Sequence, residues 1–221
     1  MKGQQLPLSV QLRDTASFDS FHAGPNALAV AALRELRGAV LIFGAPGSGR
    51  THLLQAVARA RGGAYLPLRE LRTLGADALD GLDAVPTLCL DDLDAVSEDR
   101  DWSLALLRLI DTRRSRGLPL ALSASAAPDR LAAALPDLRT RLLLCSVFGL
   151  KPLDDDDRAA LLRERARARG LELPPEVSRW LLTQLPRDAG SLVDAIDALD
   201  RASLSAKRRL TLPFVQSVVR A

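Results

Sequence analysis

The sequence predicts an α/β protein with a five-stranded parallel sheet core and a small helical domain at its C-terminal end. Between residues 39 and 150, short apolar runs alternate with glycine-rich turns and amphipathic stretches, the pattern of a parallel sheet covered on both faces. After Lys151 the patterns are helical, with no strand between them. A chain of 221 residues, 48% apolar and 26% charged, is large enough for such a core with one appendage.

The expected strands are short aliphatic runs that end in turn residues. They are predicted at Ala39–Phe43, Ala64–Leu68, Thr87–Asp91, Leu118–Ser125 and Leu142–Leu150. A helix is expected over Arg50–Arg61, directly after the first glycine-rich turn. A second helix follows the third strand, because Trp102, Leu106 and Ile110 recur on one face.

The C-terminal part begins with a proline and four consecutive carboxylates, Asp154–Asp157, which favour a helix N-terminus. Gly170 ends this helix, and three further helices are expected within residues 174–185, 188–204 and 211–219. We therefore predict three parts: an extended tail (1–14), an α/β core (15–150) and a helical domain (151–221).

The turn after the first strand, "GAPGSGRT", matches the phosphate-loop pattern G-x-x-x-x-G-K-[ST] except at Arg50. Its glycines let backbone N–H groups face a phosphate, at which the following helix points its positive end. The candidate nucleotide-binding residues are Gly44, Pro46, Gly47, Ser48, Gly49, Arg50, Thr51 and His52. For His52, a packing or surface role is the simpler interpretation. A guanidinium can neutralise phosphate but cannot take the position of a lysine ammonium, so we expect binding to survive better than hydrolysis.

Two carboxylates, Asp91 and Asp92, end the third strand, where an acidic partner of a phosphate loop belongs. Asp91 and the Thr51 hydroxyl are the candidate Mg²⁺ ligands if a nucleotide is bound. A glycine turn beside an unrelated acidic turn is the alternative. The position of both elements at strand ends favours a phosphate-binding core.

Several stretches together resemble the DnaA-related AAA+ family: "GAPGSGRTHLLQAV", "LCLDDLDAV", "LPDLRTRL" and "LDRASLSAKRRLTLPFV". The likeness covers nearly the whole chain and is greatest to the Hda subfamily, in which arginine is common in the phosphate loop. The resemblance implies a AAA+ core with a helical lid, and DnaA and the sliding clamp (the DNA polymerase III β subunit) as partners. It also implies a function in replication control, since such proteins act with the DNA-loaded clamp to trigger hydrolysis of DnaA-bound ATP and prevent re-initiation. DnaA continues into a DNA-binding domain, whereas this chain stops at Ala221, so no direct sequence-specific DNA binding is expected.

Gln5, Leu6 and Leu8 lie in "QLPLSV", which resembles the clamp-binding peptide of this subfamily. Such a tail can dock as a short linear segment whose side chains fill pockets of the partner. Gln4 leaves the register open by one residue, and a tail with chance leucines is the alternative.

The resemblance further implies that Arg141 is an arginine finger acting in trans on the nucleotide of DnaA. Arg139, two residues earlier, leaves open that Arg141 is one more surface arginine. The chain departs from the family at Ser125, where a sensor aspartate is usual, and at Gly190, where the lid normally supplies a sensor arginine. Binding of ADP or another nucleoside diphosphate is therefore expected, without efficient hydrolysis by this chain itself.

Composition favours a cytoplasmic protein that does not enter a membrane. Cys89 and Cys145 stand in apolar runs, as buried thiols do in a reducing compartment, and no apolar window approaches the roughly 20 residues of a membrane span. A formal charge of +3 gives little support to electrostatic DNA binding. A homodimer is compatible with the sequence. The competing functions are an autonomous ATP-driven loader or remodeller of the helicase-loader type and a DNA-binding initiator fragment.

Overall fold

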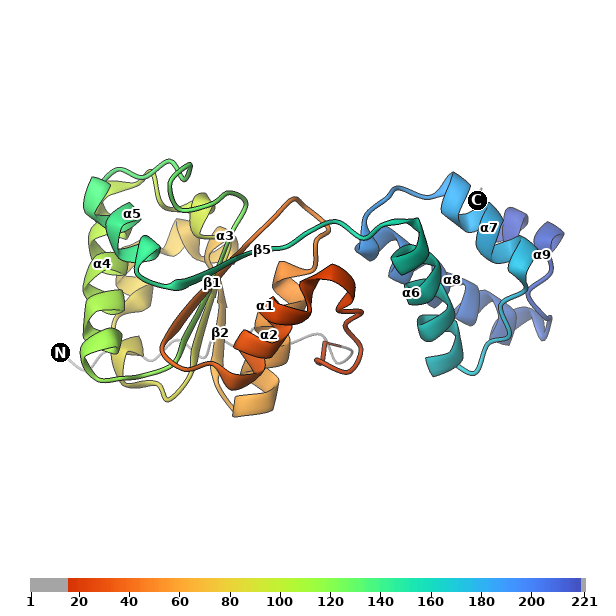
Figure 1. The fold of residues 1–221 in the computed structure, drawn as a ribbon, viewed down its shortest axis with the longest axis horizontal. Coiled ribbons are helices and arrows are strands. Elements are labelled where there is room, and N and C mark those ends of the chain that lie inside the picture. The colour runs from red at the N-terminus through yellow and green to blue at the C-terminus, as the bar shows by residue number, and fades with distance from the viewer. Residues whose placement is uncertain (1–15, 220–221) are drawn as a thin grey trace.

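The computed structural model describes residues 16–219, which form an α/β core and, beside it, a lid of four helices (Figure 1). Gln5, Leu6 and Leu8 of the clamp-binding prediction lie outside the described residues. Within residues 16–219, no helix has the length and apolar character needed to cross a membrane.

The core is built on a five-stranded sheet in the order β2-β3-β4-β1-β5, in which every neighbouring pair is parallel. The strands are β1 (Ala39–Phe43), β2 (Ala64–Pro67), β3 (Leu88–Asp91), β4 (Leu120–Ala124) and β5 (Ser146–Gly149). This confirms the predicted fold class. Because parallel strands share one carboxyl edge, the turns after β1, β3 and β4 meet there.

Helices cover both faces of the sheet (Figure 1). They are α1 (Ala27–Glu35), α2 (Arg50–Arg61), α3 (Leu68–Leu71), α4 (Arg100–Ser115) and α5 (Pro136–Leu143). Val40 and Ile42 of β1 pack with α1 and α2, whereas Leu41 between them packs with α3, α4 and α5. This alternation along β1 is the expected two-residue period of a strand buried on both sides.

Short 3₁₀ helices complete the core. They span Gly24–Asn26, Arg72–Leu74, Ala76–Leu79, Leu82–Ala84 and Leu93–Ala95.

The predicted strand over residues 142–150 is wrong in its first half. Pro136 and Asp137 in the first turn start α5, which runs through Leu143. Leu138 and Leu142 are the buried residues of this helix, whereas Leu143 and Leu144 are 56% and 54% exposed. The apolar run is therefore shared between a helix end and a turn, and β5 begins only at Ser146.

The lid consists of α6 (Asp155–Ala168), α7 (Pro175–Gln184), α8 (Ala189–Ala206) and α9 (Leu212–Val219), as the helical patterns predict. It has an apolar core of its own, which includes Leu162, Leu181 and Ile196. Asp154 and Asp188 cap α6 and α8, and such a cap contributes roughly 1 kcal/mol to helix stability. The last strand of the core ends at Gly149, five residues before the Asp154 cap.

Candidate nucleotide site at the phosphate loop

The turn between β1 and α2 has the tight geometry that its glycines predict. Gly47 and Gly49 have φ values of +76° and +91°, a backbone region that residues with a Cβ rarely adopt. A Cβ on Gly44 would lie 2.9 Å from the Ser48 hydroxyl oxygen and 3.2 Å from the backbone oxygen of Leu150. The loop then enters α2 at Arg50, so the positive end of the helix dipole faces the turn.

Two buried polar atoms of this loop have no hydrogen-bond partner among the described residues: the Ser48 hydroxyl oxygen and Nη1 of Arg50. An unpaired buried donor costs about 1–3 kcal/mol, so such atoms call for a ligand or water. A phosphate oxygen accepts hydrogen bonds from both a hydroxyl and a guanidinium. The loop therefore fits a phosphate group, with Ser48 and Arg50 as donors.

Arg50 extends from the start of α2 to the end of β3. Its Nη2 lies 3.6 Å from Oδ1 of Asp92, and its side chain is only 12% exposed. Arg69 reaches the other oxygen of the same carboxylate, with Nε 3.1 Å from Oδ2. The loop cation is thus held by an acidic group while one of its nitrogens stays unpaired.

Asp91 is buried within the sheet at 2% exposure. One of its oxygens accepts a 2.7 Å hydrogen bond from the Tyr65 hydroxyl, and the other accepts one from the Ser123 hydroxyl. Burial, followed by the charge of Asp91, raises the pKa of Tyr65 well above its usual range, so the phenol remains a donor. The assignment of Asp91 and Thr51 as Mg²⁺ ligands stays a prediction. Both carboxylate oxygens of Asp91 already accept hydrogen bonds from side chains of the neighbouring strands.

The segment before α1 packs on the phosphate loop. A Cβ on Gly49 would lie 2.5 Å from Cε2 of Phe21, so the Phe21 ring covers this glycine. His52 binds the same segment: its Nε2 lies 2.9 Å from the Ser17 carbonyl oxygen, and its ring centroid is 5.6 Å from that of Phe21. In this structure His52 therefore anchors the N-terminal segment on α2.

The same segment also reaches the lid. His22 lies between two carboxylates of α6, with Nδ1 2.9 Å from Glu164 and Nε2 3.4 Å from Asp157. Asn26 holds the connection between core and lid, donating to the Lys151 carbonyl at 3.0 Å and accepting from the Lys151 N–H at 2.7 Å. None of these contacts follows from a local sequence pattern.

The lid touches the phosphate loop through Asp188. A Cβ on Gly47 would lie 2.5 Å from Cβ and 2.9 Å from Oδ1 of Asp188. Asp188 precedes α8, where its carboxylate accepts hydrogen bonds from the N–H and hydroxyl of Ser191 at 2.8 and 2.7 Å. The lid residue nearest this part of the loop is therefore an anion, and no motif of the sequence singles it out.

Comparisons with known proteins agree with this architecture. The family model described as "Hda, lid domain" matches residues 155–219. Domain III of the replication initiation protein DnaA from Thermotoga maritima is 21% identical, with a TM-score of 0.81 over 95% of this chain and 97% of that one. AMPPCP-bound DnaA from Aquifex aeolicus is 22% identical, with a TM-score of 0.75 over 87% of this chain and 67% of that one. A RuvB variant from Thermotoga maritima is 15% identical, with a TM-score of 0.69 over 93% and 71%.

Residues 155–219 thus match the Hda lid-domain family, and the chain as a whole has the fold of DnaA domain III. These matches support the resemblance seen in the sequence through the lid family, and they confirm the predicted folds of the core and the lid.

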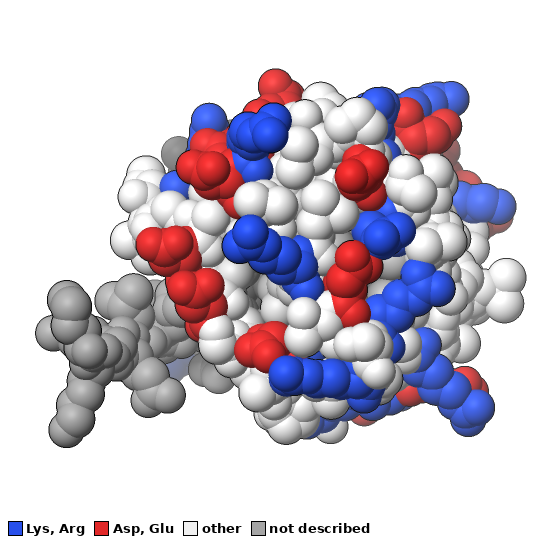
Figure 2. Space-filling view, turned by 90° about the vertical axis from the view of Figure 1, so that its left-hand side faces the viewer, with Lys and Arg blue, Asp and Glu red and all other residues white. Residues whose placement is uncertain are grey.

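Arg141 lies on α5, at the end of the AAA+ core that is farthest from the lid (Figure 1). Its Nε donates to Oδ1 of Asp111 on α4 at 2.7 Å, and the two side chains are 38% and 49% exposed. Figure 2 shows this end of the molecule, where acidic and basic side chains alternate with uncharged surface. Ser125, directly after β4, donates its backbone N–H to Oδ1 of Asp94 at 2.8 Å.

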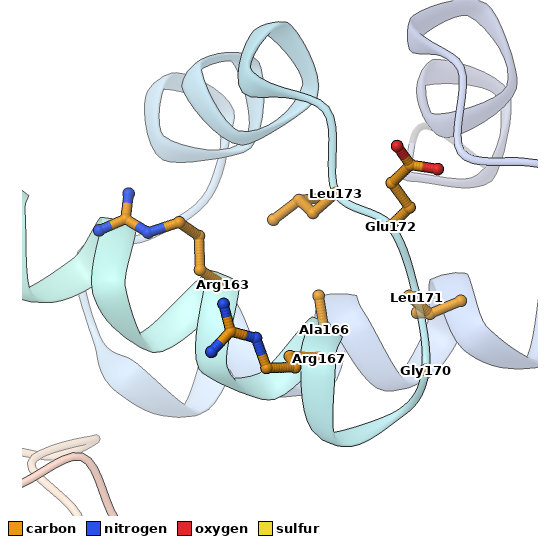
Figure 3. Close-up of a pocket in the computed structure, with 7 residues that line it drawn as sticks. All are labelled: Arg163, Ala166, Arg167, Gly170, Leu171, Glu172 and Leu173. Carbon is orange, nitrogen blue, oxygen red and sulfur yellow. The ribbon is translucent and has the colours of Figure 1, made fainter.

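A surface hollow of about 420 Å³ lies in the Hda-type lid, between α6 and the segment that leads to α7 (Figure 3). Arg163, Ala166 and Arg167 line it from α6, and residues 170–173 form its other side. It contains none of the candidate nucleotide-binding residues, so the site assignment rests on the phosphate loop.

Proposed function

We propose that this protein is a cytoplasmic regulatory adaptor of DnaA. Together with the DNA-loaded sliding clamp, it stimulates hydrolysis of DnaA-bound ATP and so represses re-initiation of chromosomal replication. The Hda-type lid on a DnaA-type core supports a role in DnaA regulation in general. The clamp and the stimulation of hydrolysis are the more specific part of the proposal.

The observation that carries the proposal is the position of Arg141. A group that acts on a nucleotide held by another protein must lie on an outer surface, away from the lid that covers its own loop. Arg141 is half-exposed on α5, opposite the lid, and its hydrogen bond to Asp111 orients the guanidinium. A guanidinium presented to a transferring phosphoryl group stabilises the charge that develops there and can raise the rate by about 10³–10⁵.

The protein's own loop binds ADP or another nucleoside diphosphate in this proposal. The unpaired Ser48 and Arg50 donors and the loop N–H groups hold the phosphates, and Thr51 and Asp91 are the candidate Mg²⁺ residues. Bound magnesium would neutralise phosphate charge. The resident nucleotide then stabilises the arrangement of core and lid rather than driving turnover.

The test is ATP hydrolysis by DnaA, measured with DNA-loaded clamp and each variant of this protein. Arg141→Ala should reduce the stimulation at least tenfold, whereas Arg139→Ala, on the same helix, should be much milder. Arg141→Lys should restore little, because a point charge does not reproduce the guanidinium fork. Full stimulation by Arg141→Ala would refute the finger assignment.

The clamp arm is tested separately by changing Gln5 and Leu6 to alanine. Direct titration with the clamp should show loss of binding, while circular dichroism and the melting temperature should stay unchanged. Unaltered affinity would contradict the tail assignment. Steady-state ATP hydrolysis by the purified protein alone distinguishes the adaptor from a loader, because a loader needs turnover of its own.

A further inference from the structure

A carboxylate of the lid, that of Asp188, lies beside the phosphate loop at Gly47. The approach of Asp188 to Gly47 is so close that a single added methyl group on the glycine would overlap the Asp188 side chain, at 2.5 Å from its Cβ and 2.9 Å from Oδ1. Gly190, in the same turn, has no side chain that could bring a cation to the loop. The lid side chain that lies against Gly47 of the loop is therefore the carboxylate of Asp188.

The Asp188 carboxylate is ionised at neutral pH. Burial on its own would raise the pKa of Asp188, but hydrogen bonds from the Ser191 hydroxyl and from backbone N–H groups outweigh it and lower the pKa below its usual value. The neighbouring cation is engaged elsewhere, because Arg187 binds the Asp155 carboxylate on α6. The negative charge at Gly47 is thus built into the cap of α8.

We propose that Asp188 makes the phosphate loop selective for a nucleoside diphosphate over a triphosphate. The inference rests on the proposed nucleotide site. Arg50, Thr51 and the start of α2 attract phosphates to the loop, and Gly47 of the same loop lies against Asp188 of the lid. A triphosphate carries about one more negative charge than a diphosphate and needs more room beyond these groups. Asp188 opposes both requirements.

The expected size of the effect follows from Coulomb's law. One additional unit charge at roughly 6 Å from a carboxylate, in a partly hydrated site, changes the binding constant by about tenfold. The same carboxylate also caps α8, so the experiment must remove its charge while keeping a side chain that can cap the helix. Asparagine and serine are both good N-cap residues and carry no charge.

The experiment is calorimetric titration of the full chain with Mg-ADP and with Mg-ATP. Asp188→Asn and Asp188→Ser are compared with the parent protein and with Asp99→Asn. Asp99 is the matched control, because it caps α4 by accepting from the N–H groups of Asp101 and Trp102 and lies on the core, away from the lid. Circular dichroism verifies that each variant is folded.

Both Asp188 variants should shift the ratio of ATP to ADP affinity towards ATP by about tenfold, and Asp99→Asn should leave the ratio unchanged. An unchanged ratio in folded Asp188 variants that still bind ADP would overturn the selectivity inference and leave the nucleotide site intact. If neither the parent nor the variants bind either nucleotide, the nucleotide site itself is wrong and the inference falls with it.

Discussion

The Phe21 ring over the phosphate loop makes Gly49→Ala a sensitive probe of the site. Gly49 has a φ of +91°, and its Cβ would lie 2.5 Å from Cε2 of Phe21. A left-handed backbone costs a residue with a Cβ about 1–2 kcal/mol. Overpacking of a well-fitted contact costs about 1–3 kcal/mol in addition. We therefore expect the free energy of unfolding to fall by about 2–5 kcal/mol.

Gly62→Ala separates the two contributions. Gly62 caps the opposite end of the same helix, α2, with a φ of +60°, and no atom lies within 4 Å of the position of its Cβ. This substitution introduces backbone strain without a clash, so it should cost only about 1–2 kcal/mol. The difference between the two alanine variants then measures the contact with Phe21.

A double-mutant cycle with Phe21→Ala completes the experiment. Removing the ring makes room for the new methyl group, so the double variant should be more stable than the sum of the single effects by about 1–3 kcal/mol. Urea unfolding is followed by fluorescence in a Trp180→Phe background, which leaves Trp102, buried in the core, as the only tryptophan. A coupling energy below about 0.5 kcal/mol would show that Phe21 does not pack on Gly49 in solution.

Two further substitutions and one labelling experiment test other parts of the structure. Arg113 is fully buried and donates to three backbone carbonyls, so Arg113→Ala should lower the free energy of unfolding in urea by about 3–5 kcal/mol. Arg114→Ala, at the exposed neighbouring position, should change it by no more than about 0.5 kcal/mol. Burial raises the pKa of Cys145 to about 11 from 9.0, so alkylation of the native thiol at pH 7.5 should be about 100-fold slower than in urea and should accelerate as the pH rises towards 11. His22→Ala removes the contacts with two α6 carboxylates, so amide hydrogen exchange at the start of α6 should become faster; unchanged exchange would contradict this role.

The position of the candidate site could be predicted from the sequence because it depends on local patterns. A glycine-rich turn after one strand and a pair of carboxylates after another must share the carboxyl edge of a parallel sheet, whatever the strand order. The partners of Asp91 could not be predicted in the same way. Ser123 faces Asp91 only because β4 lies beside β3, and Tyr65 only because β2 lies on its other side. Strand order is a property of the whole chain.

The role of the N-terminal segment could not be predicted for a related reason. The sequence "ALAVAALRE" of α1 is apolar on most sides, so its buried face is evident only from its packing against α2 and β1 in the structure. His22 contacts Asp157 and Glu164, which follow it in the chain by 135 and 142 positions, and no local sequence pattern predicts such distant pairs. Helix α5 is not evident from the sequence, because an apolar run that ends a helix and precedes a strand has the same pattern as one longer strand.

The charge that the lid places at the phosphate loop bears on two separate roles: hydrolysis at the protein's own loop, and the proposed action on a nucleotide held by another protein. Position 190 is a glycine and so provides no cationic side chain. In the structure the carboxylate of Asp188 lies beside Gly47 of the loop. Hydrolysis develops negative charge on the terminal phosphate, and stabilising that charge requires cations aimed at it. A carboxylate beside Gly47 acts in the opposite direction, which disfavours turnover at the protein's own loop. Arg141 lies on α5, at the end of the core farthest from the lid, so the action in trans that we propose for it would be electrostatically independent of a nucleotide held at the protein's own loop.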